Sequence, residues 1–334
     1  MKKQYVILKI AITYNTKSMK PAVAIDSKKI FVAGGTGFLG SRLVRKLKIL
    51  GMRYCTTSLS LGVDFRDKRQ VDKYFEIEKP NVVINCATFI GGIKFGLDHE
   101  GEIIYNNSLM STNLIEASRK YNVKRFINPI SNCSYPDISN KKFKETEWWN
   151  GPLNRTVLGY GMIRKLSWVN LFAYRNQYKL DSQSFLIPNM YGPGDHFDEV
   201  RSHALGALIK RIFAAKKQRE KQVVIWGTGK PIREWIYVED CVDIFIKSLS
   251  FETSIQPINI GRGEGVSIAR LANLIKQATG YKGKLVFDKT RPDGAPYKIM
   301  NVTVMKKKFN WFPKINVETG IKKTVKWYYK SLRK

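Results

Sequence analysis

Short apolar runs alternate with amphipathic stretches along the first half of the chain. Four runs are typical of buried strands: Lys28–Ala33, Arg53–Thr57, Asn81–Cys86 and the run that begins Arg125–Pro129. Three stretches between them have helical spacing: Ser41–Leu50, Asp67–Glu78 and Asn107–Tyr121. In the first stretch, Leu43, Val44, Leu47 and Leu50 share one face. This βαβαβ succession predicts a doubly wound parallel α/β sheet with right-handed crossovers.

The second half of the chain has a mixed pattern. Helical spacing covers Gly161–Tyr178, His203–Lys217 and Ser267–Thr279, and strand-like runs cover Val223–Trp226 and Leu285–Phe287. We therefore expect a smaller mixed α/β unit beside the parallel sheet.

A glycine-rich loop stands between the first predicted strand and the first predicted helix. Gly34, Gly37 and Gly40 give the spacing G-x-x-G-x-x-G. Glycines let the backbone approach a pyrophosphate closely, and a helix N-terminus offers it free N–H groups and a positive dipole. The loop therefore predicts a Rossmann-type unit that binds a dinucleotide.

The end of the second predicted strand bears on the choice of dinucleotide. A site for NAD usually has an acidic residue there, which binds the ribose 2′-hydroxyl. This chain has Tyr54-Cys55-Thr56-Thr57-Ser58 and no acid. Without a carboxylate there is no repulsion of a 2′-phosphate, so NADP is favoured, with NAD as the alternative.

The composition adds a strong positive charge. The 334 residues include 58 Lys+Arg and 27 Asp+Glu, a formal net charge of +31. The basic residues are scattered in short groups such as Lys28-Lys29 and Lys306–Lys308, so we expect solvated faces or attraction of a small polyanion, not nucleic acid. No apolar run approaches the roughly 20 residues that span a bilayer, so we expect no membrane partner.

The few cysteines and histidines indicate a reducing compartment. Cys55, Cys86, Cys133 and Cys241 form no C-x-x-C pair, and only three histidines are present. We expect no metal, no disulfide scaffold and a cytoplasmic protein. Residues 1–27 have a basic start and an apolar stretch interrupted by Lys9, so we interpret them as an N-terminal extension and not as a signal peptide.

From Ser131 onward, longer motifs resemble one family. The blocks are SNCSYP from Ser131, PNMYGPGDHF from Pro188, SHALGALIKR from Ser202, WGTGKPIREWIYVED from Trp226 and RPDG from Arg291. Together with Tyr160, they resemble GDP-L-fucose synthases, extended short-chain enzymes that epimerise and reduce a GDP-4-keto-6-deoxy sugar.

This resemblance implies an organisation in two parts. A Rossmann domain would comprise residues 28–187 with a return near 234–250, and a discontinuous substrate domain would comprise 188–233 and 251–334. The resemblance also implies a homodimer, because the fold commonly dimerises through two helices.

The resemblance also implies roles for individual residues. Ser131 and Tyr160 would bind and protonate the C4 oxygen, while Cys133 and His203 would act as acid and base on the neighbouring carbons. The implied cofactor contacts are Gly34, Thr36, Gly37, Phe38, Leu39, Gly40, Asp64, Ala87, Tyr160 and Arg164. The implied substrate contacts are Asn189, Arg211, Trp226, Arg233 and Lys298.

One position departs from the family pattern. The family has Tyr-x-x-x-Lys, and this chain has Tyr160-Gly-Met-Ile-Arg164 followed by Lys165. The downstream spacing places Arg164 on the lysine position, so we expect Arg164 to assist Tyr160 and Lys165 to point elsewhere.

Three functions remain open from the sequence. The first is a bifunctional epimerase–reductase of a GDP-4-keto sugar. The second is a nucleotide-sugar reductase, epimerase or dehydratase that performs one step or uses another nucleotide. The third is a non-catalytic regulator that binds NAD(P), which the intact set of Ser131, Cys133, Tyr160 and His203 disfavours.

Overall fold

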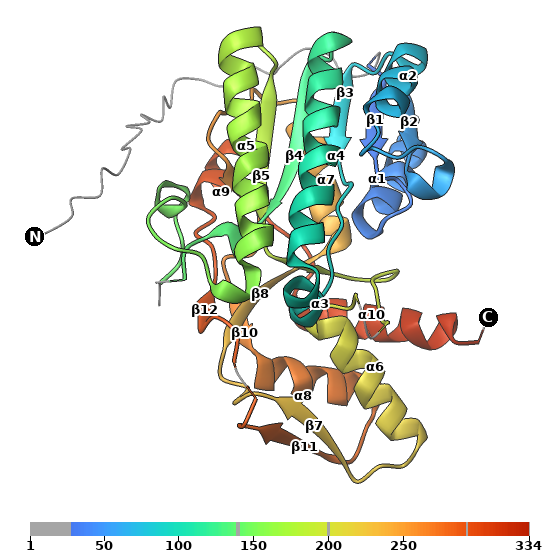
Figure 1. The fold of residues 1–334 in the computed structure, drawn as a ribbon. Coiled ribbons are helices and arrows are strands. Elements are labelled where there is room, and N and C mark those ends of the chain that lie inside the picture. The colour runs from blue at the N-terminus through green and yellow to red at the C-terminus, as the bar shows by residue number, and fades with distance from the viewer. Residues whose placement is uncertain (1–27, 138–140, 199–200, 292, 334) are drawn as a thin grey trace, which may run out of the picture.

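The computed structural model describes residues 28–137, 141–198, 201–291 and 293–333. The predicted N-terminal extension, residues 1–27, lies outside the described residues. The described chain forms two units, one around a six-stranded sheet and one around smaller sheets (Figure 1). Within these ranges, none of the helices has both the length and the apolar character needed to cross a bilayer.

A parallel sheet with the strand order β2-β1-β3-β4-β5-β9 forms the centre of the first unit. Its strands are β1 (Ile30–Ala33), β2 (Tyr54–Thr57), β3 (Val82–Asn85), β4 (Arg125–Ser131), β5 (Ser182–Ile187) and β9 (Ile258–Asn259). Every residue of β1, β3 and β5 is buried, as expected of strands covered on both faces. The predicted doubly wound parallel sheet is therefore confirmed.

Helices cover the two faces of this sheet (Figure 1). One face carries α1 (Phe38–Ile49), α7 (Val238–Ser248) and α9 (Thr303–Phe309), and the other carries α2 (Lys68–Glu78), α4 (Glu100–Lys120) and α5 (Leu158–Tyr178). Alternate residues of β1 show the two layers. Ile30 and Val32 pack with α1 and α7, whereas Phe31 and Ala33 pack with α2 and α4.

The helix α4 begins earlier than its sequence pattern predicts, at Glu100 instead of Asn107. Two buried polar residues obscure the amphipathic pattern in its first turns. Asn107 donates hydrogen bonds to the carbonyl oxygens of Phe89 and Ile103, and Asn106 donates one to Glu102. These bonds satisfy the amide groups, so the helix can bury them.

The second unit contains three helices and two small sheets. The helices are α6 (Ala204–Lys217), α8 (Ile268–Thr279) and α10 (Val317–Ser331). In one sheet, β8 (Ile232–Tyr237) contacts β6 (Asn189–Tyr191), β10 (Gly265–Ser267) and β12 (Tyr297–Lys298). The other sheet pairs β7 (Gln222–Trp226) with β11 (Lys284–Asp288). A short helix, α3 (Ile93–Asp98), precedes α4 in the first unit.

Two elements from the last part of the chain pack with the central sheet. Residues 251–334 were expected in the substrate domain, but β9 pairs with β5 in the central sheet, with Ile258 opposite Phe185. The α9 residues Met305 and Phe309 also lie in the same core cluster as β1. A two-residue strand has too little sequence pattern to be recognised. The remaining division of the chain stays a prediction.

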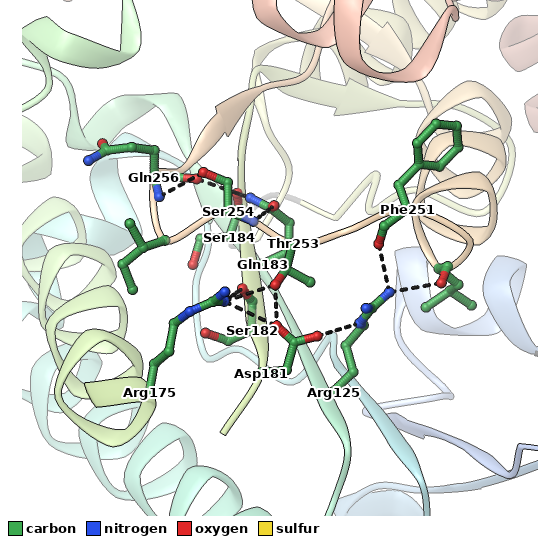
Figure 2. A network of polar contacts seen from close by, with 12 residues as sticks. Arg125, Arg175, Asp181, Ser182, Gln183, Ser184, Phe251, Thr253, Ser254 and Gln256 are labelled. Carbon is green, nitrogen blue, oxygen red and sulfur yellow. Dashed lines mark hydrogen bonds and ion pairs between the residues drawn. The ribbon is translucent and has the colours of Figure 1, made fainter. Parts of the chain in front are cut away.

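A polar network fastens the connection between α7 and β9 to the amino ends of β4 and β5 (Figure 2). Asp181 accepts hydrogen bonds from Arg125 and Arg175, at 2.9 and 3.1 Å. Arg125 also donates to the carbonyl oxygens of Leu249 and Phe251, at 2.8 and 2.9 Å. Charge-assisted bonds of this kind are stronger than neutral ones, so the network holds the returning chain in register for β9.

Candidate active site

The glycine loop joins β1 to α1 at the carboxyl edge of the sheet. Gly34 has φ +80°, and a Cβ there would lie 2.8 Å from the backbone nitrogen of Ala87. A Cβ at Gly40 would lie 2.2 Å from the carbonyl oxygen of Gly34. Only glycine fits these two positions. Because the loop packs closely without side chains there, the N-terminus of α1 stays accessible to a ligand. Its N-cap, Gly37, has no capping side chain, and the first turn has no acidic residue.

Three hydroxyl groups meet beside this loop at the end of β2. Thr36 Oγ1 lies 2.8 Å from Ser58 Oγ and 2.9 Å from Ser60 Oγ, and the two serine oxygens are 3.0 Å apart. The nearest acid in sequence, Asp64, forms an ion pair with Arg66, whose hydrogen bond lowers the pKa of the Asp64 carboxyl. The predicted role of Asp64 in cofactor binding stays a prediction.

Ser131 and Cys133 lie where the chain leaves β4. Ser131 is the last residue of β4, and Asn132–Ser134 form a single 3₁₀ turn. Ser131 Oγ accepts a hydrogen bond of 3.2 Å from the Cys133 backbone N–H, while Ser134 Oγ donates one of 2.6 Å to the Ser131 carbonyl. The turn is therefore fixed from both ends, with the serine and cysteine two residues apart.

Tyr160 and Arg164 lie one turn apart on α5, as the sequence predicts. The Arg164 guanidinium donates a hydrogen bond of 2.9 Å to Tyr160 Oη, and its centre lies 4.6 Å from the centre of the Tyr160 ring. The same nitrogen of Arg164 donates to Thr88 Oγ1. Lys165 points away, because its Nζ donates to the Trp148 carbonyl at 2.7 Å and lies over the Trp149 ring. Arg164 therefore contacts Tyr160 and Lys165 does not, and the catalytic role of Arg164 stays a prediction.

His203 is the N-cap residue of α6 and directs its side chain into the site instead of capping the helix. Burial lowers the pKa of its imidazole, and His196 acts in the same direction. A neutral imidazole has one N–H donor and one acceptor nitrogen, so it can give or take a proton near neutral pH.

Two adjoining cavities share Ser131, Tyr160, Asn189 and His203 as lining residues. The glycine-loop cavity also contains Gly37, Phe38, Leu39, Ala87 and Arg164 from the predicted set. The Cys133 cavity also contains Cys133, Arg233 and Lys298. Its volume is about 930 Å³, including space open to solvent. Of the five predicted catalytic residues, Ser131, Tyr160 and His203 thus line both cavities, while Cys133 lines only one of them and Arg164 only the other.

Other predicted residues lie outside the walls of both cavities. Gly34, Thr36, Gly40 and Asp64 surround the glycine loop or the chain after β2. Arg211, on α6, donates to the carbonyl of Val224 at 2.9 Å. Trp226, at the end of β7, is 56% exposed and lies below the Arg291 guanidinium. Substrate contacts by Arg211 and Trp226 stay predictions.

Two residues at the site, Thr88 and Glu100, were not predicted from the sequence. Thr88 lines the glycine-loop cavity and accepts from Arg164, and its place just after a predicted strand was an available signal. Glu100 lines the Cys133 cavity and accepts hydrogen bonds from Arg155 and from the Gly159 N–H, at 2.9 and 3.2 Å. The late predicted start of α4 hid this contact.

A sequence comparison supplies the deciding observation. Residues 30–261 match the sequence profile of the NAD dependent epimerase/dehydratase family. The chain belongs to this family. One relative is GDP-L-fucose synthase 1 of Arabidopsis thaliana. It is 34% identical to this chain, and the match covers 92% of this chain and 94% of the relative. GDP-L-fucose synthase of Escherichia coli K12 is 32% identical over 91% of this chain and 97% of its own.

Solved structures give the same picture. A GDP-6-OMe-4-keto-L-xylo-heptose reductase from C. jejuni superposes on this family member with a TM-score of 0.85, at 27% identity over 91% of this chain and 98% of that one. A GDP-L-fucose synthetase from Naegleria fowleri with NADP bound has a TM-score of 0.83, at 25% identity over 95% and 99% of the two chains. The resemblance inferred from the motifs is confirmed.

Proposed function

We propose that this protein is an epimerase–reductase that acts on a GDP-linked 4-keto sugar with NADPH as the hydride donor. The observation that carries the proposal is that Ser131, Tyr160 and His203 line both cavities, with Cys133 in the wall of one of them. Relatives named GDP-L-fucose synthase and a GDP-sugar reductase of the same fold support it.

Cys133 and His203 serve the inversion step. A ketone makes the C–H bonds beside it acidic, so a base can remove one proton and an acid can return another on the opposite face. Cys133 and His203 line the same cavity from different elements, the turn after β4 and the start of α6. An acid and a base placed on opposite faces of the sugar can invert a carbon in this way.

Ser131, Tyr160 and Arg164 serve the reduction step. The two hydroxyl groups hold the C4 oxygen, and Tyr160 donates a proton to that oxygen as it becomes an alcohol. The Arg164 guanidinium, 2.9 Å from Tyr160 Oη, stabilises the oxygen that has lost its proton. NADPH, when bound, supplies the hydride that reduces C4.

The residues around the glycine loop fit a dinucleotide. The cradle at Gly34 and Gly40 has no room for a Cβ, and the N-terminus of α1 is free to meet a pyrophosphate. Ser58 stands where an NAD-specific site would have an acid, so a 2′-phosphate meets hydroxyl groups there. This arrangement supports NADP over NAD.

For the nucleotide diphosphate we propose Arg233, which lines the Cys133 cavity and is held by its own neighbour, the Ile232 carbonyl. A guanidinium matches phosphate oxygens in a two-pronged geometry. Asn189 lines both cavities and donates a hydrogen bond to the Glu234 carbonyl at 3.1 Å. Arg211 and Trp226 would contact the more distant part of the nucleotide.

The test is NADPH oxidation, followed by absorbance of the reduced nicotinamide, with GDP-4-keto-6-deoxy-mannose and its UDP counterpart. We expect turnover with the GDP substrate and deuterium uptake beside the ketone in heavy water. No absorbance loss with any GDP- or UDP-linked 4-keto sugar would refute the reductase. Turnover with the UDP sugar alone would replace the proposed nucleotide.

We also propose that the protein forms a homodimer through the outer faces of α4 and α5. Ile104 and Tyr105 on α4, and Met162, Leu166 and Val169 on α5, are each between 40% and 65% exposed. Light scattering should give twice the chain mass, and Met162→Glu should halve the measured mass.

The described cysteines are free thiols, which supports a cytoplasmic location.

A further inference from the structure

Lys298 has an unusual place for a lysine. It lies on β12, opposite Arg233 of β8, and only 6% of it is exposed. Its Nζ donates two hydrogen bonds of 2.9 Å, to the carbonyl oxygens of Tyr135 and Pro136. These carbonyls directly follow the 3₁₀ turn that carries Cys133. The ammonium group therefore binds the backbone of the Cys133 segment.

The ammonium group of Lys298 is buried among carbonyl oxygens and an aromatic ring. Among the residues that the structure describes, Lys298 takes part in no ion pair, and its Nζ lies 5.2 Å from the centre of the Phe143 ring. Burial lowers its pKa to about 8, while Cys133 and Asp137 favour the charged form and Arg233 opposes it. Lys165 also lies within electrostatic reach of it. A buried cation that forms no ion pair is stabilised by a close neighbour that becomes negative.

Cys133 is that neighbour. Burial raises the pKa of its thiol, whereas the hydrogen bond from Ser131, the charge of Lys298 and the charge of Arg164 act in the opposite direction. His203 lines the same cavity as Cys133. A thiol must lose its proton before it can act as a base, and nearby positive charge is what makes this loss easier.

We propose that Lys298 is a positioning residue that holds the Cys133 turn by its two backbone carbonyls and stabilises the Cys133 thiolate. The inference rests on the proposed epimerase function, in which Cys133 exchanges protons with the sugar. It also changes the assignment of Lys298, which was expected to contact the substrate. Two of its three N–H donors are already used by the protein.

The experiment measures the thiolate directly. Wild-type protein, Lys298→Met and Lys298→Arg are treated with iodoacetamide between pH 6 and 10, and alkylation of the Cys133 peptide is followed by mass spectrometry. We expect the Lys298→Met curve to move upward by about one pH unit, which is roughly tenfold slower alkylation near pH 7.5. Lys298→Arg keeps the charge and should remain within about threefold of wild type.

Matched controls separate charge from misfolding. Lys94→Met removes an exposed lysine paired with Asp98 on α3, and it should leave the curve in place. Alkylation of the fully buried Cys241 reports unfolding, so a valid variant keeps Cys241 protected. If Lys298→Met unfolds, Lys298→Gln serves as the neutral variant in its place.

The outcomes distinguish this inference from the proposed function. An unchanged Cys133 curve in a folded Lys298→Met protein overturns the inference, as does a Lys298→Arg curve that moves upward like that of a neutral variant. A raised KM for the nucleotide sugar with an unchanged curve would return Lys298 to substrate binding. Alkylation requires no turnover, so a failure of the proposed reaction would not affect it.

Discussion

The two sides of the site differ in whether their residues come from one structural unit or from both. Ser131, Tyr160 and Arg164 stand on β4 and α5, neighbouring elements of the central sheet unit. In the proposed inversion, Cys133 works with His203 at the start of α6 and with Lys298 of β12, which belong to the second unit. The reductive side is thus assembled within one unit. The epimerising side is complete only when the second unit is docked.

This difference implies that substitutions can separate the two steps. Removing the Tyr160 hydroxyl should abolish proton donation while leaving the Cys133 side intact. We expect Tyr160→Phe to lower the rate of NADPH oxidation by about 10²–10⁴-fold, the usual contribution of a positioned acid. Deuterium uptake into the sugar, measured by mass spectrometry without NADPH, should continue. Loss of both activities in a folded variant would contradict the separation.

Cys133→Ser should give the reverse pattern. A serine hydroxyl is a far weaker acid than a thiol, so deuterium uptake should fall by a similar factor, about 10²-fold or more. His203→Gln should do the same, and binding of NADPH by Cys133→Ser should stay as in wild type because Cys133 is not in the wall of the glycine-loop cavity. Full deuterium uptake by both variants would show that the two residues serve packing.

A change beside the glycine loop should affect only the reductive side. Ser58→Asp places a carboxylate where the 2′-phosphate of NADPH is expected, and we predict about 10–100-fold weaker NADPH binding from like-charge repulsion. Binding of NADH should weaken less or improve. Titration by nicotinamide fluorescence measures both, with Ser60→Ala as a control that adds no charge. Equal losses for both cofactors would argue against this site for the 2′-phosphate.

Arg164 and Lys165 provide a comparison within one helix. Arg164 contacts Tyr160 Oη, and Lys165 contacts the Trp148 carbonyl. Arg164→Ala should slow NADPH oxidation by more than about tenfold, because it removes a charge-assisted bond next to the proton donor. Lys165→Ala should stay within about twofold, since a change far from the reaction leaves the barrier nearly unchanged. The opposite ranking would make Lys165 the catalytic cation.

The smallest effect concerns stability and pH. Burial lowers the pKa of Lys165 to about 8 from its ordinary value of 10.5. Between these values the unfolded chain binds more protons than the folded one, so this residue makes the free energy of unfolding rise with pH. From pH 8 to 9.5, wild type should gain about 1–2 kcal/mol relative to Lys165→Met in urea unfolding. No difference between their pH slopes would indicate that Lys165 titrates normally.

The contrast between the two sides also explains which features were predictable. β1, α1 and the glycine loop depend on local spacing, and the sequence pattern places all three within a few residues. The one-turn relation of Tyr160 to Arg164 follows from helix periodicity, and it is seen.

Features that depend on contacts between distant segments were not predictable in the same way. Lys298 lies 165 positions from Cys133, and no pattern in the chain states that its ammonium binds the Tyr135 and Pro136 carbonyls. β9 was missed because two residues carry no periodicity, although burial between β5 and α9 defines it. Family motifs indicated which residues meet, but not which atoms they contact.

The late arrival of β9 has a consequence for how the protein is made. The strand that covers the edge of β5 is synthesised after β6, α6, β7 and β8, so a growing chain that ends before Ile258 has an incomplete sheet. An unpaired strand edge attracts other chains, and sheet contacts between distant segments form slowly. The hydrogen bonds from Arg125 to the Leu249 and Phe251 carbonyls involve residues that are synthesised just before β9. The order of synthesis therefore lets Arg125 bind the connecting segment directly before β9 pairs with β5.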